Sequence, residues 1–413
     1  MNVEIVTVGT ELLLGFTVDT NGAELGRGLA AAGAAVVRRT AVPDRPDAVR
    51  AAVAEALDRT GFVVTTGGLG PTRDDLTKHV VAELFGRALV LDEAVLRALE
   101  ARFRRFGRPM PESNRGQAEV PQGATVLANP RGTAPGLWLE DDRGRTVVML
   151  PGVPSEMRGL LAEQVLPRLA GRTGGTVVRS RTLRTTGVPE SALAERIGPI
   201  EAEIAPLTFA YLPGPEGVDL RLTAWGLSGD EAERLMKRAV DGLRPRLGEH
   251  CYGEDGTDLA AVVLDALRVG RRRLAVAESC TGGLLGQRLT AVPGSSDLFV
   301  GGVVAYADEV KCRYLGVPPK VLEAHGAGSE ETVRAMVEGA CRAFDVPCAL
   351  AITGIAGPSG GTPEKPVGTV WLAARADGAT RVATRVLPGD RHEIRSRSAQ
   401  AALDLLRRLL RGG

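Results

Sequence analysis

Residues 62–70 read Phe-Val-Val-Thr-Thr-Gly-Gly-Leu-Gly, an apolar and β-branched run that passes directly into glycines. The same change from strand-like to turn-forming sequence occurs after residues 3–8 and after residues 147–150. Helical patterns at Ala48–Leu57 and Leu76–Phe85 lie between these runs. Buried strands that alternate with amphipathic helices are typical of a mostly parallel, doubly wound α/β sheet. Ligands of such sheets bind at the carboxyl ends of the strands.

The chain of 413 residues is longer than one compact core usually holds. The doubly wound pattern predicts a first domain at 1–167. A change in the order of strand-like and helical segments then predicts a small α+β module at 177–248. A linker is expected at 248–257, and a second α/β domain at 257–413. In the module we expect strands 177–186 and 218–225, helices 189–197 and 229–243, and a turn at Pro213–Gly217. In the last domain we expect strands 274–277, 300–306, 349–353 and 369–374, with helices 259–269, 281–290, 330–344 and 392–410.

Composition excludes several classes of protein. Lys plus Arg is 51 and Asp plus Glu is 50, so no global field draws the chain to nucleic acid or to anionic lipid. No apolar run approaches the roughly 20 residues of a membrane-spanning helix. The first residues carry an acid and no basic segment, unlike a secretory signal. The five cysteines match neither a zinc site nor a disulfide framework, which favours a cytoplasmic protein.

One candidate site follows the strand at 62–66. Glycines after a buried strand let backbone N–H groups approach an anion, and the next helix attracts it. Asp74 and Asp75 have two interpretations: they cap the helix at 76–85, or they help to hold a divalent cation against a substrate phosphate. Glu11 and Asp19 lie on the loop after the first strand and could add oxygen ligands. The expected substrate-binding residues of this loop are Gly67, Gly68, Gly70 and Thr72.

A second candidate site is Ala277-Glu-Ser-Cys-Thr-Gly-Gly283. Ser279 is either the N-cap of a helix or a nucleophile whose oxyanion is stabilised by backbone donors at Thr281, Gly282 and Gly283. Cys280 is adjacent and could compete for the nucleophile role, but a thiol one residue further along the chain is expected to point elsewhere. With only four histidines in the chain, the candidate base is Lys311. It acts as a base if it is desolvated, and is an ordinary surface residue if it is exposed.

The order of motifs resembles the competence/damage-inducible protein A (CinA) family along nearly the whole chain. The motifs in the first domain are Gly9–Gly15, Asp19–Asn21, Thr66–Thr77, Asn129–Gly136 and Leu150–Met157. Those in the last domain are Ala277–Gly283, Pro293–Ser296, Tyr306–Lys311, Thr353–Gly361, Lys365–Trp371 and Gly389–Arg391.

The resemblance implies three parts: an N-terminal molybdopterin-binding-like domain, a KH-type α+β middle module and a C-terminal α/β amidohydrolase domain. The last domain resembles amidohydrolases that convert nicotinamide mononucleotide to nicotinate mononucleotide and ammonia without a metal. Their motif positions make Ser279 the nucleophile and Lys311 its base, with Tyr306 nearby. Thr353 and Arg391 would orient the substrate, Arg391 at its phosphate.

In this family the first domain is associated with divalent-metal-dependent hydrolysis of ADP-ribose. By motif position Asp75 and Glu11 are the leading metal or phosphate ligands, followed by Asp74 and Asp19. The middle module lacks a Gly-x-x-Gly loop suited to RNA, so it is expected to be a spacer or dimer element. A homodimer without membrane or direct nucleic-acid contact is implied. The alternative function is a non-catalytic recruiting protein in competence or recombination, with a pterin- or nucleotide-binding first domain.

Two segments depart from the family pattern. The family's common Gly-Ala-Val-Ser-Glu is here Gly326-Ala-Gly-Ser-Glu330, and its Tyr-Ser-Asn before the lysine is Tyr306-Ala-Asp308. Neither change removes a residue to which the resemblance assigns catalysis, so we expect amidase activity to survive.

Overall fold

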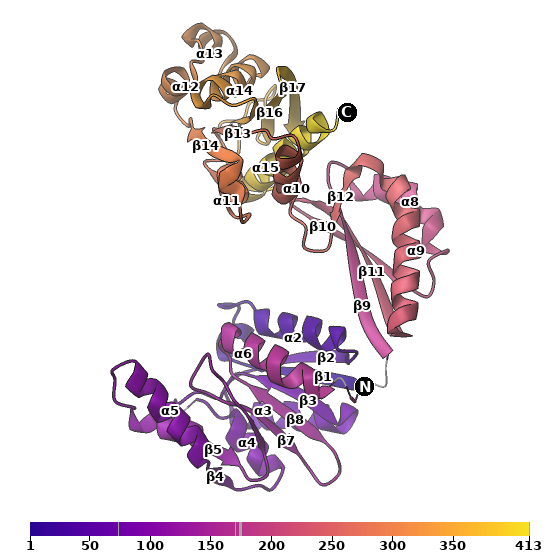
Figure 1. Ribbon diagram of the computed structural model, residues 1–413, viewed down its shortest axis with the longest axis vertical. Coiled ribbons are helices and arrows are strands. Elements are labelled where there is room, and N and C mark those ends of the chain that lie inside the picture. Colours follow the sequence, from indigo (N-terminus) through magenta and orange to yellow (C-terminus); the bar gives the residue numbers. More distant parts are fainter. Residues whose placement is uncertain (73, 170, 173–175, 413) are drawn as a thin grey trace. The chain divides into compact units, whose positions relative to one another are not determined.

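The computed structural model describes residues 1–72, 74–169, 171–172 and 176–412 (Figure 1). The chain divides into two compact units, Met1–Arg179 with Ala224–Arg234, and Ser180–Thr223 with Leu235–Gly413. Within the described ranges, no helix is both long enough and apolar enough to cross a membrane.

The N-terminal domain is built on a six-stranded sheet in the order β2-β1-β3-β8-β7-β6. The four strands β2, β1, β3 and β8 are parallel, and β7 is antiparallel to both of its neighbours, so the prediction of a mostly parallel sheet is confirmed. The strands are β1 (Asn2–Val8), β2 (Ala35–Val42), β3 (Phe62–Thr66), β6 (Thr125–Leu127), β7 (Gly136–Glu140) and β8 (Thr146–Leu150).

Helices cover both faces of this sheet (Figure 1). One core joins Val6 and Val63 to α3 (Pro46–Thr60) and α4 (Thr77–Leu84). The other joins Val3 and Ile5 to α2 (Thr20–Ala31) and α6 (Pro154–Leu160). Because both faces are buried, β3 and β8 carry continuous apolar runs rather than an alternating pattern. The remaining elements are α1 (Thr10–Leu13), β4 (Leu89–Leu91), α5 (Glu93–Arg105), η1 (Glu112–Ala118), β5 (Glu119–Pro121), η2 (Leu161–Val165) and α7 (Leu166–Leu169).

The middle module is a four-stranded sheet in the order β10-β11-β9-β12. Its elements are β9 (Thr176–Thr185), α8 (Glu190–Glu201), β10 (Thr208–Gly214), β11 (Gly217–Ser228), α9 (Gly229–Leu247), η3 (Gly248–His250) and β12 (Cys251–Glu254). The turn predicted at Pro213–Gly217 closes the hairpin of β10 and β11, where Gly214 is paired with Gly217. The linker prediction for 248–257 is wrong in part, because β12 pairs with β9.

The C-terminal domain has a five-stranded sheet in the order β14-β13-β15-β16-β17. Strands β14, β13 and β15 are parallel, and β16 and β17 are antiparallel additions. The strands are β13 (Leu274–Glu278), β14 (Phe299–Val304), β15 (Cys348–Gly354), β16 (Thr369–Ala376) and β17 (Ala379–Val386). The helices are α10 (Leu259–Val269), α11 (Leu284–Thr290), η4 (Ser295–Asp297), α12 (Asp308–Leu315), α13 (Pro319–His325), α14 (Glu330–Phe344) and α15 (Arg391–Leu410).

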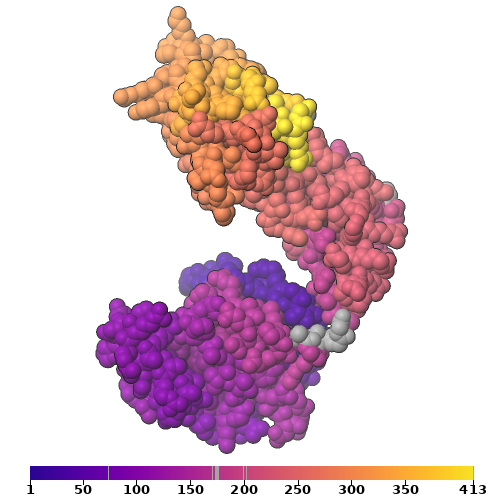
Figure 2. Space-filling model, in the orientation of Figure 1, coloured from indigo at the N-terminus to yellow at the C-terminus, as the bar shows by residue number. Residues whose placement is uncertain are grey.

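The two faces of this sheet pack against different helices. Apolar residues of α10, α11 and α15 meet one face, and those of α12 and α14 meet the other. The C-terminal segment, yellow in Figure 2, lies on the surface, and Arg411 and Gly412 after α15 are exposed. The four predicted strands are confirmed, whereas β17, α12 and α13 were not foreseen.

Candidate functional site

Ser279 lies at the carboxyl end of β13, between the ends of β14 and β15. Its backbone N–H donates to Ile352 O at 2.9 Å, and the carbonyl of the preceding residue, Glu278, accepts from Ala305 N at 2.7 Å. Ser279 is buried, with an exposed fraction of 8%. The hydroxyl is therefore placed where three parallel strands end, the edge at which open α/β sheets bind ligands.

Lys311 is buried and points back to the end of β14. It lies on α12, and its Nζ donates to Tyr306 O at 3.0 Å and to Asp308 Oδ1 at 3.1 Å. Its side chain is 1% exposed, so the interpretation as an ordinary surface lysine is wrong. Within the described residues no hydrogen bond joins Nζ to the Ser279 hydroxyl. Such contacts are often long in the absence of substrate and tighten when it binds.

Ser279 is not a helix cap, because α11 begins later than its sequence suggests. Gly282 and Gly283 have φ angles of +58° and +95°, a left-handed conformation that a right-handed helix cannot include. The helix therefore starts at Leu284, with Gly283 as its N-cap residue.

The carboxylate of Glu278 binds the N-terminus of α11. Its oxygens accept from Gly283 N at 3.0 Å, Leu285 N at 3.1 Å and Gly286 N at 2.8 Å. The N–H of Gly283 is thus occupied, and that of Gly282 donates to Ser279 O at 3.1 Å. In the described part of the chain, the neighbouring amides with no protein acceptor are those of Cys280 and Thr281. They replace Gly282 and Gly283 as the candidate oxyanion donors.

Cys280 does not compete as a nucleophile. Its side chain is buried, and burial raises the pKa of the thiol to about 11. The thiol therefore stays protonated near neutral pH, and a protonated thiol is a poor nucleophile.

Two arginines at the start of α15 reach the loop after β13 and the segment that follows β14. Arg391 donates from Nη1 to Gly357 O at 2.6 Å and from Nη2 to Tyr306 Oη at 2.9 Å. Arg395 lies one turn later and donates to Thr281 O from Nε at 3.1 Å and from Nη2 at 2.7 Å. The structure thus joins Arg391 to Tyr306 and adds Arg395, which the motifs did not single out. Its spacing of four residues from Arg391 on one helix was the available signal.

Thr353 lies near the carboxyl end of β15, the third of the parallel strands. It is 1% exposed, and its Oγ1 donates to Ala327 O at 2.7 Å. Glu278 is in register with Ile352, so Thr353 follows on β15 beside Ser279. The predicted substrate-orienting residue is therefore close in the sheet to the predicted nucleophile.

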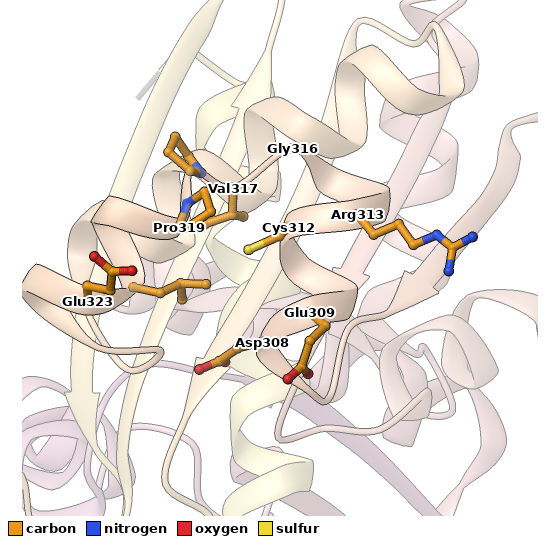
Figure 3. A pocket seen from close by; sticks show the side chains of 10 residues that line it. Asp308, Glu309, Cys312, Arg313, Gly316, Val317, Pro319 and Glu323 are labelled. Atoms are coloured by element: carbon orange, nitrogen blue, oxygen red, sulfur yellow. The ribbon is translucent and has the colours of Figure 1, made fainter.

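A shallow groove between α12 and α13 lies beside this site (Figure 3). Asp308, Glu309 and Cys312 line it from α12, and Pro319 and Glu323 line it from α13. Asp308 belongs both to this groove and to the surroundings of Lys311, since its carboxylate also accepts from Lys311 Nζ. The lysine itself does not line the groove, so its amine is not open to solvent on that side.

In the N-terminal domain the ends of β1, β3 and β8 meet at glycines. Gly67 has a φ of +104°, and a Cβ there would lie 2.2 Å from Val8 O, so only glycine fits. Asn21 links the strands by donating from Nδ2 to Thr66 Oγ1 at 3.0 Å and to Gly152 O at 2.7 Å. Its Oδ1 is buried without a hydrogen-bond partner in the described residues.

The acidic residues of this domain have mainly structural partners. Asp75 accepts from Thr72 N at 2.8 Å and from its hydroxyl at 2.5 Å, which closes the turn before α4. The helix has Leu76 at its N-cap and no side-chain cap, so the capping interpretation of Asp74 and Asp75 is wrong.

Asp19 caps α2 through Gly22 N and is paired with Arg39 at 3.3 Å. Glu11 lies in α1, with its carboxylate close to the Cα of Gly9. No group of three or more His, Cys, Asp or Glu side chains suited to a metal occurs in the described residues. Glu11, Asp19, Asp74 and Asp75 therefore form no such group in the described residues, and their role as metal ligands stays a prediction.

Comparison with protein families matches all three parts of the chain. Residues 4–171 match the probable molybdopterin binding domain, 180–253 match the damage-inducible protein CinA KH domain, and 256–410 match the CinA C-terminal domain. Among solved structures, a CinA superfamily protein from Klebsiella pneumoniae is 34% identical and covers 38% of this chain and 97% of its own, with a TM-score of 0.37. The molybdopterin biosynthesis enzyme MoaB from Thermus thermophilus is 26% identical over 42% of this chain and 96% of its own, with a TM-score of 0.28.

Full-length relatives match from end to end. A CinA-like protein from Gemmatimonas aurantiaca is 56% identical over 411 residues, which are 99% of this chain and 96% of the relative. A putative competence-damage inducible protein from Symbiobacterium thermophilum is 45% identical over 425 aligned positions, covering 100% of this chain and 99% of the relative. The chain, with its molybdopterin-binding-like domain, KH module and C-terminal CinA domain, belongs to the CinA family.

Proposed function

We propose that the C-terminal domain hydrolyses the carboxamide of nicotinamide mononucleotide to nicotinate mononucleotide and ammonia. The observation that carries this proposal is the burial of Lys311. An amine that is 1% exposed and lies at the end of the strand next to that of Ser279 supports a role in proton transfer, since a desolvated lysine can act as a base.

In the first step Ser279 Oγ attacks the carboxamide carbon while its proton passes to Nζ of Lys311, which acts as the base. The resulting ammonium keeps its two acceptors, Tyr306 O and the Asp308 carboxylate. The negative charge on the former carbonyl oxygen is stabilised by the N–H groups of Cys280 and Thr281. A preorganised donor of this kind contributes about 3–4 kcal/mol to the transition state.

In the second step the C–N bond breaks. Lys311 returns the proton to the leaving nitrogen, ammonia departs, and an ester to Ser279 remains. Water then attacks the ester carbon and gives a proton to Lys311, which passes it to the departing Ser279 oxygen. The products are the carboxylic acid and the free hydroxyl, so the enzyme returns to its starting state.

Substrate binding is assigned to the start of α15. Arg391 is anchored to Gly357 O and to Tyr306, so its guanidinium has a fixed position. A fixed guanidinium suits a phosphate monoester because it can offer parallel donors. We place the nucleotide phosphate near Arg391 and the pyridine ring toward Ser279.

The test is a pair of assays on the purified full chain. Ser279→Ala should abolish ammonia release from nicotinamide mononucleotide, because the substitution removes the hydroxyl that attacks the carboxamide carbon. The same variant should keep the activity of the first domain. Ammonia release by Ser279→Ala at the wild-type rate would refute the assignment.

For the N-terminal domain we propose hydrolysis of ADP-ribose to AMP and ribose 5-phosphate. The supporting observation is the set of glycines that follows the ends of β1, β3 and β8, with the unpartnered Asn21 Oδ1 beside them. A divalent cation is part of the proposal, although the acidic residues form no preformed cage. Mg²⁺ is commonly held by one or two carboxylates together with substrate phosphates. AMP production that stops with a chelator and resumes with added metal supports this activity, and AMP production that is unaffected by the chelator contradicts it.

A recruiting protein in competence or recombination is the alternative, and the near-zero net charge counts against direct DNA contact. Salt-sensitive DNA binding together with no turnover between pH 6 and 10 would favour that alternative. We further propose a homodimer, which light scattering on the eluted protein tests directly.

A further inference from the structure

We propose that Lys365 is a positioning residue that orients the hydroxyl of Thr353, so that this hydroxyl can only accept a hydrogen bond from the substrate. Thr353 would then distinguish a carboxamide from a carboxylate. The inference rests on the proposed amidohydrolase function and names a specificity-determining residue for it.

The hydroxyl of Thr353 has one hydrogen, and that hydrogen is already used. Oγ1 donates to Ala327 O at 2.7 Å, and a carbonyl oxygen cannot donate in return. What the hydroxyl can still offer is its lone pairs. Because Thr353 follows Ile352, whose carbonyl accepts from Ser279 N, Thr353 and Ser279 are neighbours at the ends of adjacent strands.

The carbonyl that takes this hydrogen belongs to a loop held by side chains. Four consecutive carbonyl oxygens, those of residues 325–328, each accept a side-chain hydrogen bond. Lys365 Nζ donates to His325 O at 3.2 Å and to Gly328 O at 3.1 Å, one on each side of Ala327. Ser329 and Thr332 both donate to Gly326 O, at 2.9 and 2.8 Å.

Among the described residues, Lys365 is thus the one whose side chain fixes the backbone on both sides of Ala327. If its ammonium is removed, two carbonyls lose their donor, and the loop keeps side-chain donors from Ser329 and Thr332 only at Gly326 O; we expect the peptide of Ala327 to turn more easily. The hydroxyl of Thr353 could then rotate and donate its hydrogen into the site. A hydroxyl that can donate as well as accept no longer discriminates between the substrate carboxamide and the product carboxylate.

The chemistry of substrate and product explains the effect. A carboxamide carries two N–H donors, whereas the product carboxylate only accepts. An acceptor-only hydroxyl therefore binds the substrate amide and opposes the product, which favours product release. Leaving a buried polar group facing an unsuitable partner typically changes affinity by about tenfold or more.

The experiment measures the dissociation constants of nicotinamide mononucleotide and nicotinate mononucleotide by calorimetry on the full chain carrying Ser279→Ala, which prevents turnover. The amide should bind about tenfold more tightly than the acid. Adding Lys365→Met or Thr353→Val should bring this ratio close to one. Lys365→Arg and Thr353→Ser keep the donor or the hydroxyl and should preserve most of the ratio. Lys320→Met, on the exposed surface of α13, is the matched control and should leave the ratio within about twofold.

The direction of the change separates positioning from simple electrostatics. Both ligands carry the phosphate, so its interactions cancel in the ratio. A direct attraction between Lys365 and the product carboxylate would make Lys365→Met weaken acid binding, which raises the preference for the amide. We expect the preference to fall, and a rise or no change would overturn the inference.

Ammonia release by the chain with Ser279 intact distinguishes a failure of the Lys365 inference from a failure of the proposed amidohydrolase function. Normal release with an unchanged ratio in both Lys365→Met and Thr353→Val overturns the role of Lys365 and leaves the amidohydrolase intact. Absence of release together with no binding of either nucleotide overturns both. Thr353→Val provides the second route if Lys365→Met fails to fold.

Discussion

Replacing Glu278 with Gln should destabilise the C-terminal domain and impair its chemistry together. The carboxylate is 1% exposed and accepts three backbone hydrogen bonds, two at Oε2 and one at Oε1. A glutamine keeps one acceptor oxygen, so at least one bond is lost and an amide donor then faces a backbone donor. A hydrogen bond to a charged group contributes about 1.5–3 kcal/mol, and the retained bonds also lose their charge assistance. The expected loss is about 2–4 kcal/mol.

Calorimetric melting of the full chain measures this loss as a fall of roughly 5–15 °C in the transition of the C-terminal domain. Ammonia release should fall by roughly a hundredfold, since the loop that carries the candidate oxyanion donors loses its anchor. The matched control is Glu330→Gln on α14, where the exposed carboxylate is paired with Arg334 at 2.9 Å and contributes at most about 1 kcal/mol. A melting temperature of Glu278→Gln within about 2 °C of the wild type would refute the reasoning.

Substitutions at three further positions test other parts of the structure. Lys311→Met should reduce ammonia release about 10²–10⁴-fold, and Lys311→Arg should do the same because a guanidinium cannot accept the proton; activity in the Arg variant contradicts the role as base. Cys280→Ala should keep ammonia release. Because burial raises the thiol pKa from 9.0 to about 11, the protonated thiol stabilises the fold below pH 9, and this gain is lost as pH rises through 11. The melting temperature of Cys280→Ala should therefore fall less steeply between pH 9 and 11 than that of the wild type. An equal fall in the two proteins contradicts this role of the thiol. Gly67→Ala places a Cβ 2.2 Å from Val8 O and should impair AMP production while sparing ammonia release, and intact AMP production contradicts this.

Hydrophobic pattern was sufficient to predict the sheets but not all of their edges. Strands β1, β3, β8, β13 and β15 are buried on both faces, so their apolar runs stand out. Strand β17 has a largely exposed or half-exposed sequence, and β12 is only four residues long, so neither carries such a run. Their positions are fixed by pairing with β16 and β9, contacts that are not evident from local sequence.

For the candidate site, the sequence indicated which residues to consider but not how they are oriented. The motif around Ser279 indicated the loop after β13, yet the start of α11 depends on two left-handed glycines that the sequence also allows inside a first helical turn. The burial of Lys311 depends on α12 turning its first residues back toward β14, a tertiary feature without a local pattern. Glu278 and Arg395 were missed for the same reason, since each acts through backbone atoms of a neighbouring segment.

The pairing of β12 with β9 determines where the chain can be cut. Residues just before and within β12 are bound by two other segments of the chain. Arg407 of α15 donates to Glu249 O, and Cys251 lies in register with Thr185 of β9. A shortened protein that ends at residue 248 would expose an unpaired strand edge on β9, a surface that invites aggregation. Proteolysis between the middle module and the C-terminal domain should therefore yield fragments that do not aggregate only when the break falls beyond Glu254.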